Sequence, residues 1–227
     1  MRRMRRIGIT GNIGCGKSTA AAILAGFGAH VIDADAVVHR LLDPGSSVYD
    51  RVIEAFGQSV THSDGRINRR ALGDVVFADP DKRALLNSLI HPEVLRVILR
   101  RIDDLEKEDP DGVAVVDAAL LVETGLHEDF ETLIVVTCPP EIQVERIMRR
   151  DGLGPSEAQS RMAAQMPAEE KAKVADYRID NSGSKDDTRG QLRRIYDLIL
   201  ANRHRHRERT ARQTVAADRA QDRRQRG

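Results

Sequence analysis

Short apolar runs alternate with an Ala/Leu-rich stretch along the first 35 residues. Arg6 to Thr10 (RIGIT) is a strand-like run that ends in a glycine-rich segment. The stretch after Lys17 (STAAAILAGFG) has the composition of a helix and reaches stop signals at Gly26 and Gly28. A second apolar run, Ala29 to Asp35, follows at once. The pattern predicts a strand, a loop, a helix and a second strand, and such a crossover makes the two strands parallel.

Three later apolar runs predict three more strands. They are Val113 to Asp117, Leu133 to Thr137 and, more weakly, Tyr177 to Asp180. The first two are continuously apolar instead of alternating, which is typical of strands covered by helices on both faces. The sequence therefore predicts an α/β fold with three layers and a central five-stranded parallel sheet.

Two long helical segments interrupt this predicted core. About 75 residues separate the second and third strands, too many for a plain crossover, so we expect a helical, acceptor-binding insertion at 36–112. Residues 145–176 are helical and highly charged, and Gly152, Gly154 and Pro155 interrupt them as in a hinged lid. The nucleotide-binding core would then comprise residues 1–35, 113–144 and 177–200, ending in a helix from Gln191 to Leu200.

Charge is distributed unevenly along the chain. The formal net charge is +1, but residues 201–227 hold nine arginines against three acidic residues. We expect this tail to be disordered and to contact polyanions only weakly. The remaining chain is slightly acidic, and aromatic residues make up 3% of the sequence with no tryptophan. A specific nucleic-acid-binding protein is therefore not indicated.

Cysteine content and hydropathy bear on the compartment. Cys15 and Cys138 are too few for a disulfide framework, which suits a reducing cytoplasm. The basic opening MRRMRR is not followed by an uninterrupted apolar region, so we do not expect a secretory signal. No run approaches the roughly 20 apolar residues of a membrane-spanning helix. The sequence leaves open whether the protein is a monomer or a small homo-oligomer.

The strongest motif is GNIGCGKS at Gly11–Ser18, which satisfies G-x-x-x-x-G-K-[ST] between a predicted strand and a predicted helix. Small residues let successive backbone N–H groups turn inward around a phosphate, and the following helix presents its positive end. Lys17 would bridge the β- and γ-phosphates of ATP, and the Ser18 hydroxyl would coordinate Mg²⁺. A P-loop NTPase fold follows. The residues expected to bind the nucleotide are Gly11, Gly14, Cys15, Gly16, Lys17, Ser18 and Thr19.

The alternative reading is a glycine-rich turn with an incidental Lys-Ser pair. Cys15 is interpreted as a small residue filling the loop, in preference to a reactive thiol.

Carboxylates at two strand ends indicate phosphoryl transfer. Asp33 and Asp35 end the second strand, at the sheet edge where the glycine loop opens, so one of them can accept the proton of an attacking hydroxyl. We expect Asp33 to be this base and Asp35 to cap the next helix or bind a Mg²⁺-bound water. Asp117 ends the third strand and would reach the Mg²⁺ shell or the acceptor.

Cationic residues of the predicted lid would stabilise the transferred group. Of Arg146, Arg149, Arg150 and Arg161, we favour Arg146 and Arg150, because the i, i+4 spacing puts them on one helix face. His91 precedes Pro92 in LIHPEV, where the proline suggests a helix start. His91 is read as a substrate contact or, equally, as a capping or core histidine.

These residues resemble one family closely, that of dephospho-coenzyme A kinase, which phosphorylates the ribose 3′-hydroxyl of dephospho-CoA in the last step of coenzyme A synthesis. The resemblance runs from Arg6 to about Leu200. It rests on IGITGNIGCGKST, VIDAD, DGRINRRALGDVVF, LIHPEV, LLVE and IDNSG, in family order.

The resemblance implies roles for individual residues. Asp33 would be the general base, the insertion would hold dephospho-CoA, and Asn181 would lie beside the adenine of ATP. Leu121 and Glu123 would belong to the acceptor pocket. The family usually has a proline two residues after the aspartate of the third strand, where this chain has Ala119, so the pocket backbone can differ there.

Besides weak nucleic-acid binding through the arginine-rich tail, two other functions remain open from the sequence. The first is a kinase for another small acceptor, such as a nucleoside monophosphate. The second is a nucleotide-dependent switch or motor, although the N-K-x-D segment of guanine-specific switches is missing.

Overall fold

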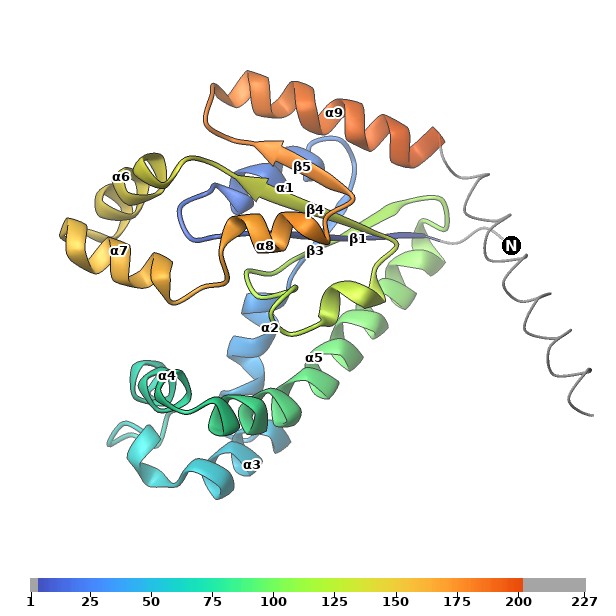
Figure 1. Ribbon diagram of the computed structural model, residues 1–227. Coiled ribbons are helices and arrows are strands. Elements are labelled where there is room, and N and C mark those ends of the chain that lie inside the picture. Colours follow the sequence, from blue (N-terminus) through green and yellow to red (C-terminus); the bar gives the residue numbers. More distant parts are fainter. Residues whose placement is uncertain (1–3, 202–227) are drawn as a thin grey trace, which may run out of the picture.

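The computed structural model describes residues 4–201, with every side chain in that range except that of Phe77. A five-stranded sheet lies at its centre, and all its strand pairs are parallel, in the order β2-β3-β1-β4-β5 (Figure 1). The predicted sheet is thus confirmed. The strands are β1 Arg5–Gly11, β2 His30–Asp33, β3 Val113–Asp117, β4 Thr132–Thr137 and β5 Tyr177–Asp180.

Alternate residues of the central strands face two separate hydrophobic clusters. Val113 and Val115 of β3 belong to the cluster that includes buried residues of α1 (Lys17–Ala25) and α9 (Lys185–Ala201). Ala114 and Val116 belong to the opposite cluster, which α2 (Ala34–Leu41) and α5 (Pro80–Glu108) help to cover. Burial on both faces explains the continuous apolar runs and produces the predicted three layers.

The predicted insertion is mainly helical, with a short antiparallel bridge between Thr61 and Ile67. After α2 come α3 (Ser47–Phe56), the 3-10 turn η1 (Gln58–Val60), α4 (Arg69–Ala78) and α5. Helix α2 begins at Ala34, so Asp35 lies in a helix and not in the strand predicted to end there. The predicted boundary between 35 and 36 therefore falls inside a helix.

Helix α5 is 29 residues long and contains Pro92 in its interior. The expectation that this proline starts a helix was wrong. A proline removes one backbone hydrogen bond, but a long apolar face outweighs that loss. The face consists of the buried residues Ile90, Val94, Ile98, Ile102 and Leu105.

The predicted lid contains three helices, α6 (Pro140–Asp151), α7 (Pro155–Ala163) and α8 (Ala168–Lys173). Helix α6 ends at Gly152, which has a φ of 69°, and α7 starts at Pro155, so the break lies where glycine and proline predicted it. The predicted boundary at 144/145 falls inside α6. A short 3-10 turn, η2 (Leu126–Asp129), precedes β4.

Helix α9 begins six residues before the predicted Gln191. Ser184 and Asp187 explain the earlier start. The Ser184 hydroxyl accepts the Asp187 N–H at 3.1 Å, and an Asp187 carboxylate oxygen accepts the Ser184 N–H at 3.0 Å. This reciprocal pair resembles a capping box, and its sequence signal precedes the apolar periodicity.

A buried lysine fastens α8 to the segment after β3. The Lys171 side chain has no exposed surface, and its Nζ donates to Ala119 O at 2.9 Å and pairs with Glu123 Oε1 at 2.7 Å. A buried ammonium is tolerated only with such partners. The base of the lid is therefore bound to the sheet by a specific polar contact.

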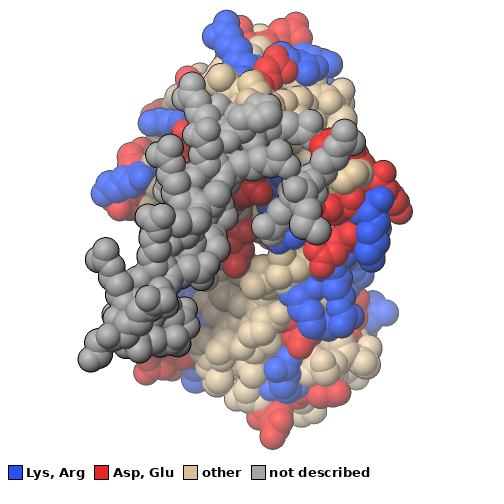
Figure 2. Space-filling view, turned by 90° about the vertical axis from the view of Figure 1, so that its right-hand side faces the viewer, with Lys and Arg blue, Asp and Glu red and all other residues tan. Residues whose placement is uncertain are grey.

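No helix within residues 4–201 combines the length and apolar character needed to cross a membrane. On the face shown in Figure 2, basic and acidic side chains are interspersed. Predictions about the arginine-rich tail concern residues 202–227, which lie outside the described part of the chain.

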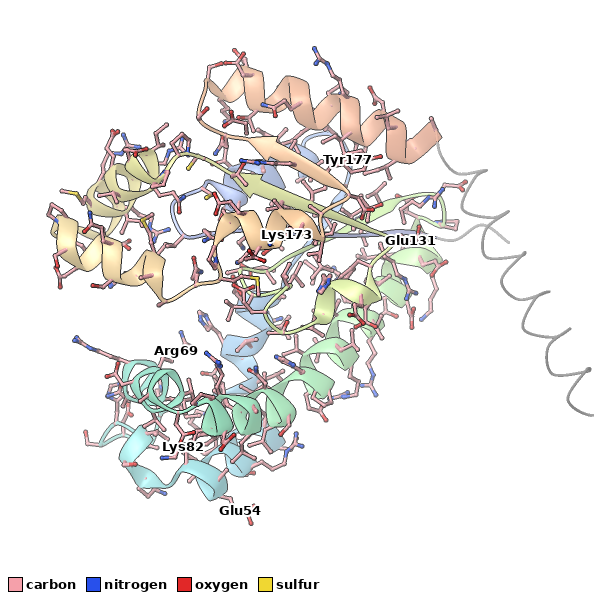
Figure 3. All side chains as sticks on the ribbon, viewed as in Figure 1. Glu54, Arg69, Lys82, Glu131, Lys173 and Tyr177 are labelled. Atoms are coloured by element: carbon pink, nitrogen blue, oxygen red, sulfur yellow. The ribbon has the colours of Figure 1, made fainter. Side chains whose placement is uncertain are left out.

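Replacing Lys171 by methionine should destabilise the protein, because the Glu123 carboxylate would lose its buried counter-charge. Breaking such pairs costs about 3–5 kcal/mol, and we expect the lower end because Glu123 is 19% exposed. Urea denaturation measures this change. Lys173→Met is the matched control on the same helix, since the exposed Lys173–Glu170 pair is worth at most about 1 kcal/mol. Figure 3 labels Lys173. Equal denaturation midpoints for the two variants would contradict the prediction.

Candidate active site

The parallel register brings the ends of three strands to one edge of the sheet. Asp117 of β3 lies opposite Asp33 of β2 and opposite Ile9 of β1. Two residues beyond Ile9, β1 ends and the glycine loop (Gly11–Ser18) begins. Glu131 and Tyr177, at the other ends of β4 and β5, mark the opposite edge (Figure 3). The carboxylates and the loop thus converge as the sequence predicted.

The loop conformation requires glycine at two positions. Gly14 has a φ of 80° and Gly16 a φ of 84°, which other residues rarely adopt. A Cβ atom at Gly14 would also lie 2.8 Å from the backbone oxygen of Gln143. Helix α1 begins directly after Gly16, so its unpaired N–H groups open into the loop.

A cleft with a volume of about 710 Å³ lies over the loop. Its lining includes six of the seven nucleotide-binding positions predicted in the loop and α1. The lining residues outside the loop and α1 come from α2, the lid, the start of α9 and the segments that follow β3 and β5. Its lining is Gly11, Asn12, Ile13, Gly14, Gly16, Lys17, Ser18, Thr19, Asp35, Ala119, Arg146, Arg149, Arg150, Gln165, Asn181, Gly183 and Lys185.

Lys17 lies between two carboxylates. Its Nζ contacts Asp117 Oδ1 directly and lies 3.5 Å from Asp35 Oδ2. Burial raises the pKa of Asp117 above its usual range, while the hydrogen bond from Lys17 opposes this rise. Asp117 is thus placed directly against Lys17 of the glycine loop.

In the VIDAD segment, the helix cap is provided by Asp33 and not by Asp35. Asp33 caps α2, because its Oδ1 accepts the Ala36 N–H at 2.9 Å. Asp35, for which we expected either the cap or contact with a Mg²⁺-bound water, is not the cap: it lies in the first turn of α2 and faces Lys17 in the cleft. A cap uses one carboxylate oxygen, so the Oδ2 atom of Asp33 is left for other chemistry.

Arg146 of α6 holds the carbonyl side of the glycine loop. Its Nη2 donates to Asn181 O at 2.9 Å, and its Nη1 lies 3.4 Å from Gly14 O. The structure therefore brings Arg146 to the site as predicted, with part of its guanidinium already engaged by the backbone.

Arg150 lines the same cleft but is held by its neighbour. Its Nε and Nη2 donate to the two Asp151 carboxylate oxygens at 2.7 and 2.9 Å, which raises the pKa of the guanidinium. Arg161 of α7 contacts the same Asp151 at 3.0 Å. Arg149, which we did not favour, also lines the cleft, so the i, i+4 argument was incomplete.

Asn181 is a structural partner of the loop. Its Nδ2 donates to Cys15 O at 2.7 Å, and its Oδ1 accepts from Thr188 Oγ1 at 2.7 Å. The side chain of Cys15 is fully buried in the core cluster, as expected of a loop filler. Both polar atoms of the Asn181 carboxamide are therefore engaged in positioning the loop. Asn181 also lines the cleft, where it can contact a nucleotide.

Comparison with known proteins decides the family. The model of the dephospho-CoA kinase family matches residues 5–187. The dephospho-CoA kinase of Symbiobacterium thermophilum is 46% identical over 189 residues, covering 83% of this chain and 79% of that protein. That of Aquifex aeolicus is 40% identical over 197 residues, covering 86% and 98%. The chain belongs to the dephospho-CoA kinase family.

Two solved structures are similar to this chain in fold and sequence. The crystal structure of TT1252 from Thermus thermophilus has a TM-score of 0.73 and 37% identity, covering 88% of this chain and 98% of that one. Dephospho-CoA kinase from Campylobacter jejuni has a TM-score of 0.60 and 30% identity, covering 86% and 97%. Family membership makes the glycine loop the ATP site of a kinase.

The acceptor residues inferred from the family resemblance fare differently. Leu121 has no exposed surface and packs in the core beside Gly8, and its assignment to the acceptor pocket stays a prediction. Glu123 pairs with Lys171 of the lid. Ala119, which stands where the family usually has a proline, accepts hydrogen bonds through its backbone oxygen from Thr10 Oγ1 and Lys171 Nζ. His91 is half-buried in α5 and does not line the cleft.

Replacing Gly14 by alanine should disrupt ATP binding, because the new Cβ would meet the Gln143 backbone and a φ of 80° costs about 1–2 kcal/mol. Calorimetric titration with ATP should show at least a tenfold weaker affinity. Gly190→Ala is the control, since Gly190 is exposed in α9 with nothing within 4 Å of the new atom. Unchanged ATP affinity in Gly14→Ala would contradict this account of the loop.

Acidification should destabilise the protein through His91. Burial lowers the pKa of His91 below its ordinary value, so the unfolded chain binds this proton more readily than the folded chain. The His91 contribution to the free energy of unfolding should therefore be constant above about pH 6.5 and should become destabilising as the pH drops below that value. Between pH 7.5 and pH 5.5, the midpoint of urea denaturation should fall further in wild type than in His91→Gln. An equal drop of the urea midpoint in wild type and His91→Gln would argue against this role. So would an equally reduced drop in the control His62→Gln, which replaces an exposed histidine.

Proposed function

We propose that the chain transfers the γ-phosphoryl group of ATP to the ribose 3′-hydroxyl of dephospho-CoA, using Mg²⁺ and Asp33. Dephospho-CoA kinase activity is the activity of the family to which the chain belongs. The observation that carries the proposed chemistry is the register of the sheet, which sets Asp33 and Asp117 side by side next to the strand that leads into the glycine loop.

ATP would lie with its phosphates in the glycine loop and over the start of α1. Backbone N–H groups and the positive helix end favour the bound anion. The Lys17 ammonium would turn from the Asp117 and Asp35 carboxylates toward the β- and γ-phosphates. The attraction of one ammonium for two carboxylates keeps Lys17 in the cleft before the nucleotide binds.

The residues present suit a magnesium ion shared with the nucleotide. Ser18, Asp35 and Asp117 offer oxygen ligands, which Mg²⁺ prefers, and Ser18 is exposed in the cleft. Within residues 4–201, no group of three or more His, Cys, Asp or Glu could hold a metal by itself. Phosphate oxygens would therefore complete the shell, and the ion would neutralise charge on the phosphates.

Asp33 is proposed as the general base through its Oδ2 atom. Among the described residues, Oδ1 is taken by the α2 cap and Oδ2 has no hydrogen-bond partner. The ribose 3′-oxygen would attack the γ-phosphorus, and the bond to the bridging oxygen of ADP would break. The hydroxyl proton would pass to Asp33. Arg146 and Arg150, which line the cleft, would stabilise the equatorial oxygens.

The helical insertion is proposed to hold the rest of dephospho-CoA. Helix α4 stands on the same side of the molecule as the lid helices α6 and α7, beyond the carboxyl ends of the strands (Figure 1). His91 and Glu123 remain proposed acceptor contacts, His91 from α5 and Glu123 from the segment after β3. A cytoplasmic location and a monomeric or small oligomeric state also remain predictions.

Replacing Asp33 by asparagine should reduce kcat about 10²–10⁴-fold, because the amide cannot accept the hydroxyl proton. The asparagine oxygen can still cap α2, so stability and ATP affinity should change little. Steady-state kinetics with ATP, Mg²⁺ and dephospho-CoA, combined with ATP titration, separate the two effects. Asp43→Asn, an exposed acid after α2, is the matched control. A kcat within threefold of wild type would remove Asp33 from the base role.

A panel of acceptors tests the proposed reaction itself. The purified protein with ATP and Mg²⁺ should phosphorylate dephospho-CoA at the 3′ position, identified by phosphorus NMR. Preference for a nucleoside monophosphate would defeat the acceptor assignment. ATP turnover without any acceptor that a macromolecule stimulates would instead favour a switch or motor.

A further inference from the structure

The lid contributes a side chain directly to the glycine loop. Gln165 lies in the turn between α7 and α8, and its Oε1 accepts the backbone N–H of Ile13 at 2.7 Å. Ile13 is the third residue of the loop. Gln165 also lines the cleft together with Lys17 and Arg146. No feature of the sequence pattern singled out this glutamine, because a polar residue between two helices is ordinary.

The position of Gln165 is fixed by its neighbours. The next residue, Met166, accepts a hydrogen bond through its backbone oxygen from Asn12 Nδ2 at 3.0 Å. Five residues later, the buried Lys171 bonds Ala119 O, which also accepts from Thr10 Oγ1 at 3.1 Å. The turn is thus fastened to the glycine loop and to the end of β1, so Gln165 is held before any ligand binds.

The bond to Ile13 determines the orientation of the carboxamide. An N–H group needs an acceptor, so Oε1 must face Ile13 and Nε2 must be the other end. Among the described residues, none accepts a hydrogen bond from Nε2. Two N–H donors are therefore available at the wall of a phosphate-binding cleft.

The side of the loop that Gln165 contacts indicates which phosphate it can reach. Asn181 and Arg146 approach the loop at Gly14 and Cys15, from the β5 side. Gln165 approaches at Ile13, and its segment is tied to Ala119, after β3. Because Asp117 ends β3 beside Asp33, this is the side from which the acceptor hydroxyl would come. The phosphate that meets the acceptor is the γ-phosphate.

We propose that Gln165 Nε2 donates a hydrogen bond to an equatorial oxygen of the γ-phosphoryl group, which makes Gln165 a catalytic residue supplied by the lid. No proton is transferred and no covalent bond forms at Gln165. A hydrogen-bond donor that is already held in place stabilises the negative charge on these oxygens during transfer, because the donor does not have to reorient. The inference rests on the proposed placement of ATP in the glycine loop.

Gln165→Glu separates this role from a purely structural one. The glutamate keeps an oxygen for the Ile13 N–H, so the loop stays anchored, but it replaces the amide donors with a negatively charged oxygen. We expect kcat to fall about 10- to 100-fold. The affinity for ATP should fall at least tenfold, whereas the affinity for ADP, which has no γ-phosphate, should stay within about twofold. Gln165→Met, which is similar in length but has no hydrogen-bonding group, should also lose kcat.

Ala164→Glu is the matched control, because it places the same charge on the adjacent, exposed residue, which does not line the cleft. Its kcat and its ATP-to-ADP affinity ratio should match those of wild type. Normal kcat in Gln165→Glu would overturn the proposal, and so would an equal loss of ATP and ADP affinity. Because wild type and Ala164→Glu are assayed with the same substrates, their activity distinguishes a failure of this proposal from a failure of the proposed reaction.

Discussion

The whole site depends on one constraint, that the backbone of the glycine loop must turn its N–H groups toward a common point. Gly14 and Gly16 allow this turn because glycine has no Cβ atom and adopts φ angles of 80° and 84° without a steric clash. Glycine only permits the conformation, since it also gives the chain freedom to adopt others. The surrounding polar groups select it: Asn181, Arg146 and Gln165 each hydrogen-bond to the loop backbone.

These contacts also define what can move. Helix α8 is anchored by the buried Lys171, and α6 is tied to the loop through Arg146. Between these two attachments, α6 and α7 are joined by the contact of Asp151 of α6 with Arg161 of α7. A lid motion would therefore involve the end of α6 and α7 together, while the Gln165 turn stays with the loop. If the lid closes over the substrate as proposed, the donor proposed at Gln165 would stay in place.

Much of the fold could be predicted because local patterns agree with the global structure. The strands were recognisable as short apolar runs, weakest for Tyr177–Asp180, and the lid break was recognisable from Gly152 and Pro155. The predictions were wrong where a local sequence preference was outweighed by an interaction that the sequence pattern did not reveal. Pro92 lies inside α5 because the helix buries a long apolar face, and Asp35 lies within α2 because Asp33 already caps that helix.

The sequence by itself determined the chemistry available to this protein: a phosphate-binding loop, the Lys17 and Ser18 side chains, and acidic residues at the ends of two strands. Only the tertiary structure decided how these groups are used. It gave the helix cap to Asp33, set Asp35 and Asp117 around Lys17, and brought Gln165 to a loop 152 residues earlier in the chain. The physical reason is that residue type fixes which bonds a group can make, whereas packing between distant segments fixes which partner is within reach.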